Sequence, residues 1–142
     1  MTSVADLRPR FFVDENTLPL GKALAAVRSD VVHPGHRRCP VRMGALDVEW
    51  LPYAGDAGLV LITRDIRIRH RPAEKRLFLL HGVKGIFLTK GGSMPRWDML
   101  CMIVQHWNRI EPLAEVTGPW SYSLTRAGIR ELKLPASRDG SR

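Results

Sequence analysis

The chain has 142 residues, of which 44% are apolar and 25% charged, with a net charge of +8 and an isoelectric point near 10.3. This composition excludes a disordered chain and fits one globular domain with a hydrophobic core, while the basic balance favours a polyanionic partner such as nucleic acid. The two cysteines form no disulfide framework, no apolar run is long enough to span a membrane, and the N-terminus has no signal-peptide core. We therefore expect a cytoplasmic protein that does not associate with membranes.

Strands and helices alternate along the chain. Runs of apolar and β-branched residues indicate strands, and the clearest is the continuous run at 59–63. In chain order we expect a strand at 10–15, a helix at 20–29, a strand at 31–33 and a helix at 46–58. A strand at 59–63, a helix at 72–82, a strand at 84–89 and a helix at 95–110 follow, and two strands at 120–124 and 129–134 end the domain. We expect a flexible arm at 1–9, one domain at 10–134 and a disordered tail at 135–142.

Two of the expected helices carry internal signals. In the helix at 46–58, Asp47 is a plausible N-cap, and Pro52 suggests a later start or a bend. In the helix at 95–110, Met99, Met102 and Ile103 share one apolar face, which is typical of a core and less often of an association surface. Cys101 has no basic neighbour to activate it, so we expect a buried, inert thiol.

Strands that alternate with helices predict an α/β fold in which a parallel sheet has helices on both faces. In such sheets the site lies beyond the carboxyl ends of the strands. Asp14 follows the first strand, Asp65 follows the third, and Asp47 begins the intervening helix, so the three carboxylates are expected to converge. Crowded carboxylates need a cation, and oxygen ligands suit Mg²⁺ or Mn²⁺. The sequence therefore predicts a divalent metal site that acts on phosphodiesters.

The cations around Asp65 are expected to hold substrate phosphates, and they are Arg64, Arg67, Arg69 and Arg71. Each residue also has a simpler interpretation. Asp14 fits an ion pair at a strand end, Asp47 an N-cap and Asp65 a turn residue, and the basic stretch fits a solvated face. Only the shared sheet edge favours the metal hypothesis.

Three segments together resemble the PIN-domain superfamily and, more narrowly, the VapC-type toxins of bacterial toxin–antitoxin pairs. They are FFVDEN at 11–16, LDVEWLPYAGDAGLVLITRD at 46–65 and RPAE at 71–74. The resemblance implies a three-layer α/β/α domain with a central, mostly parallel sheet. It also implies an Mg²⁺- or Mn²⁺-dependent ribonuclease that a cognate antitoxin neutralises, as a homodimer or a toxin–antitoxin hetero-oligomer.

By position, the resemblance assigns the catalytic, metal-binding acids to Asp14, Asp47 and Asp65, with Glu49 competing with Asp47. It assigns Thr63 to the hydroxyl position that orients a carboxylate or water. Many PIN domains have a further acid soon after the third aspartate. Here Ile66, Arg67, Ile68 and Arg69 follow instead, and Glu15 or Asp98 are the substitutes.

The missing fourth acid leaves two functions open. The first is a metal-dependent endoribonuclease toxin, and the second is a degenerate PIN-like protein that binds RNA or a protein partner without cleavage. Cleavage of DNA is a third possibility, because the metal chemistry does not distinguish the sugars. Two other motifs are weak: His33, His36 and Cys39 lack a fourth zinc ligand, and KGGSMP at 90–95 lacks the order of a phosphate-binding loop.

Overall fold

A six-stranded sheet forms the centre of the protein, in the strand order β2-β1-β3-β4-β5-β6. The computed structural model describes residues 8–88 and 94–134. The neighbouring pairs from β2 to β5 are parallel, and β6 pairs with β5 in the antiparallel sense. The strands are β1 Phe11–Val13, β2 Val31–Val32, β3 Val60–Thr63, β4 Lys84–Leu88, β5 Trp120–Thr125 and β6 Gly128–Leu132. The expected mostly parallel sheet is confirmed, and the predicted tail and most of the predicted arm lie outside the described residues.

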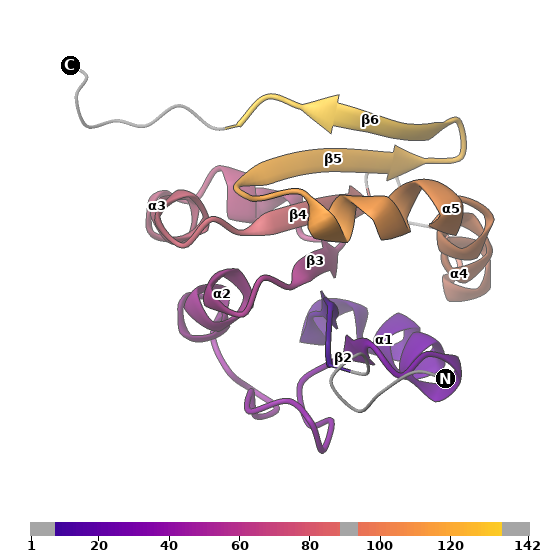
Figure 1. Cartoon of the computed structure of the whole chain (residues 1–142), viewed down its shortest axis with the longest axis horizontal. Coiled ribbons are helices and arrows are strands. Elements are labelled where there is room, and N and C mark those ends of the chain that lie inside the picture. The colour runs from indigo at the N-terminus through magenta and orange to yellow at the C-terminus, as the bar shows by residue number, and fades with distance from the viewer. Residues whose placement is uncertain (1–7, 89–93, 135–142) are drawn as a thin grey trace.

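Helices cover both faces of the sheet, which gives the three-layer α/β/α architecture (Figure 1). One face carries α1 Leu18–Val27, α4 Arg96–Gln105 and α5 Trp107–Ile110, and the other carries α2 Asp47–Asp56 and α3 Pro72–Leu80. Short 3₁₀ turns also occur: η2 Glu15–Thr17, η3 Ile66–Arg69 and η4 Glu111–Glu115. Among the described residues, no helix combines the length and apolar character needed to cross a membrane.

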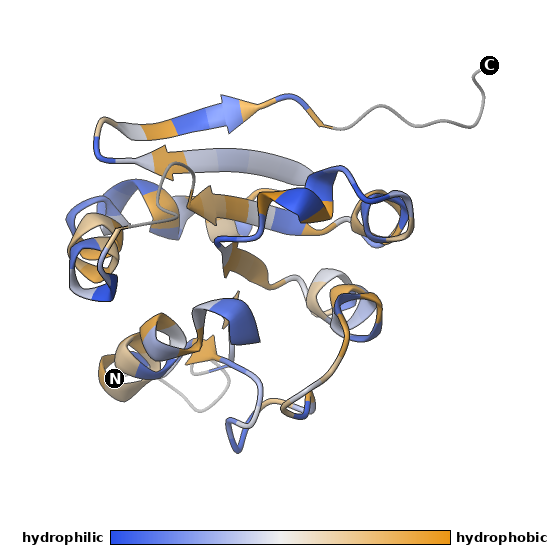
Figure 2. Cartoon of the chain, turned by 180° about the vertical axis from the view of Figure 1, so that it is seen from behind, coloured by the Kyte–Doolittle hydropathy of each residue, from blue (hydrophilic) through white to orange (hydrophobic). Residues whose placement is uncertain are grey.

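Strand alternation divides the apolar residues between two cores. Phe11 and Val13 point toward the α1/α4 side, whereas Phe12 points toward the α2/α3 side. Both faces of the sheet are therefore buried, as the continuous apolar strands predict, and β2 and β3 lie largely at the hydrophobic end of the colour scale (Figure 2). Met99, Met102 and Ile103 lie in the first core, at most 3% exposed, which confirms that face of the helix as core.

The chain changes direction across the sheet at β1. It passes from β1 through α1 to β2 on one side, and then returns through α2 to β3 on the other side of β1. The carboxyl ends of β1 and β3 thus flank the point where the strand order reverses. Ligands of open α/β sheets bind at such a point.

The opposite edge of the sheet, where the strands begin, is closed by a network of ion pairs. Asp30 accepts hydrogen bonds from Arg10 at 2.9 Å and from Arg28 at 2.9 Å, and both arginines also bind Glu111. The guanidinium of Arg28 lies 4.7 Å from the centre of a Trp107 ring. Burial alone would raise the pKa of Asp30, but the two arginines outweigh it and lower this pKa. At this edge the buried charge of Asp30 therefore has two cations beside it.

Several details of the expected helices are wrong. The helix α2 begins at Asp47, so its N-cap is Leu46 and not Asp47, and it continues through Pro52 instead of starting later. The single helix expected at 95–110 is interrupted at His106, and this turn places Trp107 on Phe11, with ring centres 4.8 Å apart. Cys101, expected to be buried, is exposed on α4.

Candidate active site

Asp14 is a buried carboxylate at the end of β1. It lies on the same side of the sheet as Phe12, beneath α2 and α3, and is 3% exposed. Its two oxygens accept hydrogen bonds of 2.9 Å each from the hydroxyls of Thr17 and Thr63. Burial raises the pKa of Asp14 to about 7; the two hydroxyls oppose the shift, and the charges of Asp47 and Asp65 add to it. In contrast to Asp30, this buried acid has no arginine among the hydrogen-bond partners that the described residues supply.

Thr63, the last residue of β3, connects two acids. Its hydroxyl donates to Asp14 and accepts from the backbone N–H of Asp65 at 3.0 Å. Asp65 in turn caps η3, because its Oδ1 accepts from the backbone N–H of Arg67 at 3.1 Å and from the Arg67 side chain at 3.0 Å. Burial would raise the pKa of Asp65, but the hydrogen bonds from Arg67 and Arg71 lower it. Thr63 therefore holds Asp14 and the start of η3 in a fixed relation.

Asp47 belongs to this group of acids, and Glu49 does not. The side chain of Glu49 accepts from the backbone N–H of Leu46 at 2.8 Å, so it supplies the cap of α2 that was assigned to Asp47. The Asp47 carboxylate is thereby left to face the other acids. Burial raises its pKa, and the charge of Asp65 raises it further.

Glu74, in the first turn of α3, is an acid of this group that the sequence analysis missed. It forms an ion pair with Arg71, and its charge interacts with Asp47 and Asp65. Burial raises its pKa. The two proposed substitutes point elsewhere, because Glu15 accepts from the backbone N–H of Gly44 at 2.7 Å and Asp98 pairs with Arg126 at 3.5 Å.

A signal for Glu74 was present in the sequence. The segment RPAE at 71–74 opens a helix that packs on the sheet, and such a helix begins at the edge where the preceding strand ends. The fourth acid therefore comes from the next helix and not from the residues that directly follow Asp65. We call Asp14, Asp47, Asp65 and Glu74 the acidic cluster.

Arg71 connects three members of the acidic cluster. Its Nη2 donates to Asp65 Oδ2 at 2.7 Å and lies 3.2 Å from Asp47 Oδ2, and its Nε pairs with Glu74. Burial would lower the pKa of Arg71, but the hydrogen bond and charge of Asp65 and the other carboxylates raise it. A single guanidinium thus neutralises part of a group of four acids.

The other arginines expected to bind phosphate differ in position. Arg67 contacts Asp65 yet keeps 69% of its side chain exposed, so it lies at the rim of the acidic cluster. Arg69 turns toward β6, where its Nη2 contacts the Lys133 carbonyl. Arg64 is partly buried, and its backbone N–H donates to Thr17 at 3.4 Å. Arg67 therefore remains the best-placed candidate for a substrate contact, and the role of Arg64 stays a prediction.

The donor atoms of the acidic cluster suit a hard divalent cation, but their present arrangement does not form a site for one. Carboxylate oxygens are the ligands that Mg²⁺ and Mn²⁺ prefer. Nevertheless, within residues 8–88 and 94–134 no three Asp, Glu, His or Cys side chains are placed to hold a metal ion together. The same holds for His33, His36 and Cys39. In their loop the ring centres of the two histidines lie 5.2 Å apart. Arg71 instead engages oxygens of Asp47, Asp65 and Glu74, and the hydroxyls of Thr17 and Thr63 engage those of Asp14.

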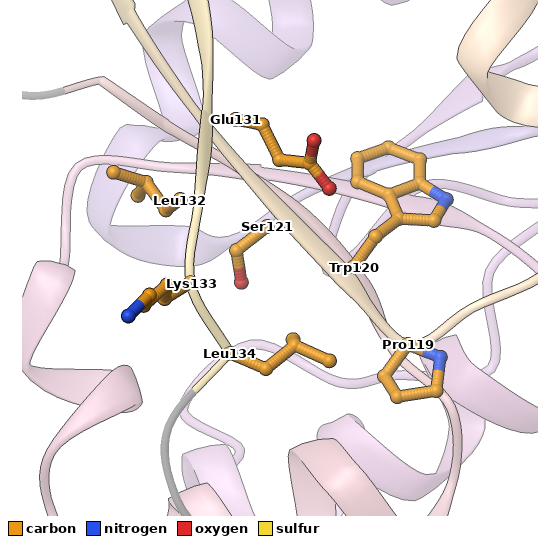
Figure 3. A pocket seen from close by; sticks show the side chains of 7 residues that line it. All are labelled: Pro119, Trp120, Ser121, Glu131, Leu132, Lys133 and Leu134. Atoms are coloured by element: carbon orange, nitrogen blue, oxygen red, sulfur yellow. The ribbon is translucent and has the colours of Figure 1, made fainter.

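A hollow of about 380 Å³ lies elsewhere, between the start of β5 and the end of β6 (Figure 3). Ser121, Leu132 and Lys133 line it. Because Ser121 pairs with Gly85 near the start of β4, the hollow lies at the edge opposite the acidic cluster. The Ser121 hydroxyl is buried and has no hydrogen-bond partner, so it presents no accessible polar group to the hollow.

Comparison with known proteins identifies one family. The family described as PIN like domain matches residues 9–90, which is more than half of the chain. All four residues of the acidic cluster, together with Thr63 and Arg71, lie within the matched segment. No curated protein and no solved structure matches the chain.

Proposed function

The chain belongs to the family of PIN-like domains, a nuclease-type fold, and we propose that it is an endoribonuclease that hydrolyses RNA phosphodiester bonds with Mg²⁺ or Mn²⁺. The observation that carries this proposal is the acidic cluster itself. Four carboxylates from the ends of β1 and β3 and the starts of α2 and α3 gather at the point where the strand order reverses, and they outnumber the two arginines, Arg67 and Arg71, that pair with them. The network around Asp30 differs in that its buried carboxylate has two arginines beside it, which lower the pKa of Asp30.

In this proposal Asp14, Asp47 and Asp65 hold the cation, and Glu74 adds negative charge beside them. The cation, when bound, supplies positive charge against the phosphodiester and makes water easier to deprotonate. Thr63 and Thr17 keep Asp14 in one orientation through their hydroxyl hydrogen bonds. The pKa of Asp14, near 7, makes this carboxylate ready to exchange a proton for a cation close to neutral pH.

The substrate in this proposal is bound through its phosphates. Arg64 and Arg67 flank Asp65, and the net charge of +8 draws a polyanion to the molecule. Because Arg67 is largely exposed while it contacts Asp65, it is able to exchange this contact for a phosphate oxygen.

Replacing Asp65 by asparagine tests the proposal. The variant is expected to lose cleavage of total RNA in Mg²⁺ while it stays folded, and EDTA is expected to abolish cleavage by the wild type. The matched control is Asp56→Asn, at the last residue of α2, where the exposed carboxylate pairs with His81. This variant should cleave RNA at the wild-type rate. Cleavage by Asp65→Asn at the wild-type rate would show that the acidic cluster does not take part in the reaction.

A second candidate function is binding of RNA or a protein partner without cleavage. It is favoured by Arg71, which occupies oxygens of three carboxylates and leaves no ready metal site among the described residues. If the protein bound labelled RNA and left the length of the RNA unchanged in both Mg²⁺ and Mn²⁺, this result would support the second candidate. The same assay with single-stranded DNA of equal sequence decides between RNA and DNA as substrate.

A toxin role with a cognate antitoxin is the finer part of the proposal. It rests on the resemblance to VapC-type toxins and is compatible with an uncharged surface on α4, where Trp97 is 71% and Val104 is 58% exposed. Such a surface suits a partner helix or a second copy of the chain. The test is co-expression with a small adjacent reading frame, which should relieve growth arrest caused by this chain alone.

A further inference from the structure

The guanidinium of Arg71 occupies carboxylate oxygens of the acidic cluster. Its Nη2 contacts Asp65 Oδ2 and Asp47 Oδ2, while its Nε contacts Glu74. These oxygens belong to the residues that would bind a divalent cation in the proposed function. A guanidinium and a metal ion that use the same carboxylate oxygens repel each other and cannot both be fully coordinated.

Arg71 is also able to leave. Its side chain is 39% exposed, and the residue caps the N-terminus of α3 just before Pro72. Its contacts with the acidic cluster are polar, so water is able to replace them when the guanidinium is released. The backbone of Arg71 has a separate role, because its carbonyl accepts from the Lys75 N–H at 2.8 Å and so begins α3. Movement of the side chain therefore leaves the helix in place.

We propose that Arg71 is a built-in counterion that competes with divalent cations for the acidic cluster, so that cation binding requires the Arg71 guanidinium to withdraw. This inference rests on the proposed metal-dependent function. It explains how the carboxylates stay close together before a cation arrives, and why their present arrangement is not that of a metal site. In this proposal Arg71 regulates the acidic cluster, whereas the sequence predicted that it would contact substrate phosphate.

The test is a calorimetric titration of the metal-free full-length protein with Mn²⁺. Replacing Arg71 by glutamine removes the competing charge, so Mn²⁺ should bind about tenfold more tightly or better, the order expected for one nearby unit charge at a partly solvated site. The control is Arg76→Gln, an exposed arginine on the same helix, which removes the same formal charge and should change the affinity less than about twofold. Arg71→Lys keeps the charge without the planar fork and should fall between the two.

The inference is overturned if Mn²⁺ binds the wild type and binds Arg71→Gln equally or more weakly, since Arg71 would then organise the carboxylates and not compete for them. If neither protein binds Mn²⁺ at millimolar concentration, the proposed metal-dependent function fails as well, so the two failures are distinguishable. Nuclear magnetic resonance of the wild type gives a second readout that needs no stable glutamine variant. Saturating Mg²⁺ should shift the Nε–H signal of Arg71, assigned by its absence in Arg71→Lys, and an unchanged signal contradicts the competition.

Discussion

Replacing Asp14 by asparagine is expected to make the protein more stable at alkaline pH, although it should also abolish catalysis. The carboxylate is 3% exposed, and its pKa is raised from 3.8 to about 7, chiefly by burial. An acid whose pKa is raised on folding favours the folded state only while it is protonated. Its contribution is therefore complete below about pH 4 and is lost as the pH rises through 7.

The size of this effect follows from the pKa difference. A shift of about three units, at about 1.4 kcal/mol per unit, amounts to ~4 kcal/mol of stability lost between acid and alkaline pH. Between pH 5 and pH 8 the wild type should lose roughly 2–3 kcal/mol that Asp14→Asn keeps. Asparagine cannot accept from both Thr17 and Thr63 as the carboxylate does, and that cost of about 1 kcal/mol is the same at both pH values.

Urea unfolding followed by tryptophan fluorescence, in EDTA at pH 5 and pH 8, measures this difference. Asp30→Asn is the matched control, because Asp30 is also a buried aspartate but has a lowered pKa from its two arginines. Asp30→Asn should lose stability by a similar amount at both pH values. If the free energy of unfolding of Asp14→Asn did not rise relative to that of the wild type from pH 5 to pH 8, the buried Asp14 carboxylate would not destabilise the folded protein as its surroundings indicate.

Three other substitutions, each measured by urea unfolding, test the residues that support the acidic cluster. Thr63→Val removes a donor to Asp14 and should cost about 1–2 kcal/mol, more at pH 8 than at pH 4; an equal cost at both would separate Thr63 from that charge. Phe78→Ala empties the fully buried contact of α3 with Phe87 and should cost about 3–5 kcal/mol, and a loss below 1 kcal/mol would mean that α3 is loosely packed. Gly55→Ala should cost at least ~2 kcal/mol, because the added Cβ would lie 2.3 Å from the His81 carbonyl oxygen; wild-type stability would show that α2 and α3 can separate.

Much of the fold is readable because its signals are local. The apolar run at 59–63 predicts a strand buried on both faces, and alternation with helices predicts the parallel sheet. The positions of Asp14 and Asp65 after β1 and β3 then follow from the rule about carboxyl ends. Sequence reasoning reaches these acids because the backbone alone determines where they emerge.

The partners of these acids are not readable in the same way. Asp47 and Glu49 are both suited to cap a helix, and only the backbone geometry at Leu46 gives that role to Glu49. Arg71 looks like one more surface cation in a basic stretch, and its direction depends on how α3 packs beside α2. Glu74 was missed for the same reason, because the sequence does not show that the first turn of α3 lies close enough to Asp47 and Asp65 for their charges to interact.

Within the described part of the chain, the hydrogen bonds and ion pairs of the acidic cluster involve only residues between 14 and 74. Strands β4 to β6 and helices α4 and α5 support this part from the side without supplying any of those contacts. The C-terminal half is therefore able to change in surface and shape while the acidic cluster keeps its contacts. A chimera that takes this half from another PIN-like protein should retain the proposed activity and change only the surfaces that other proteins contact.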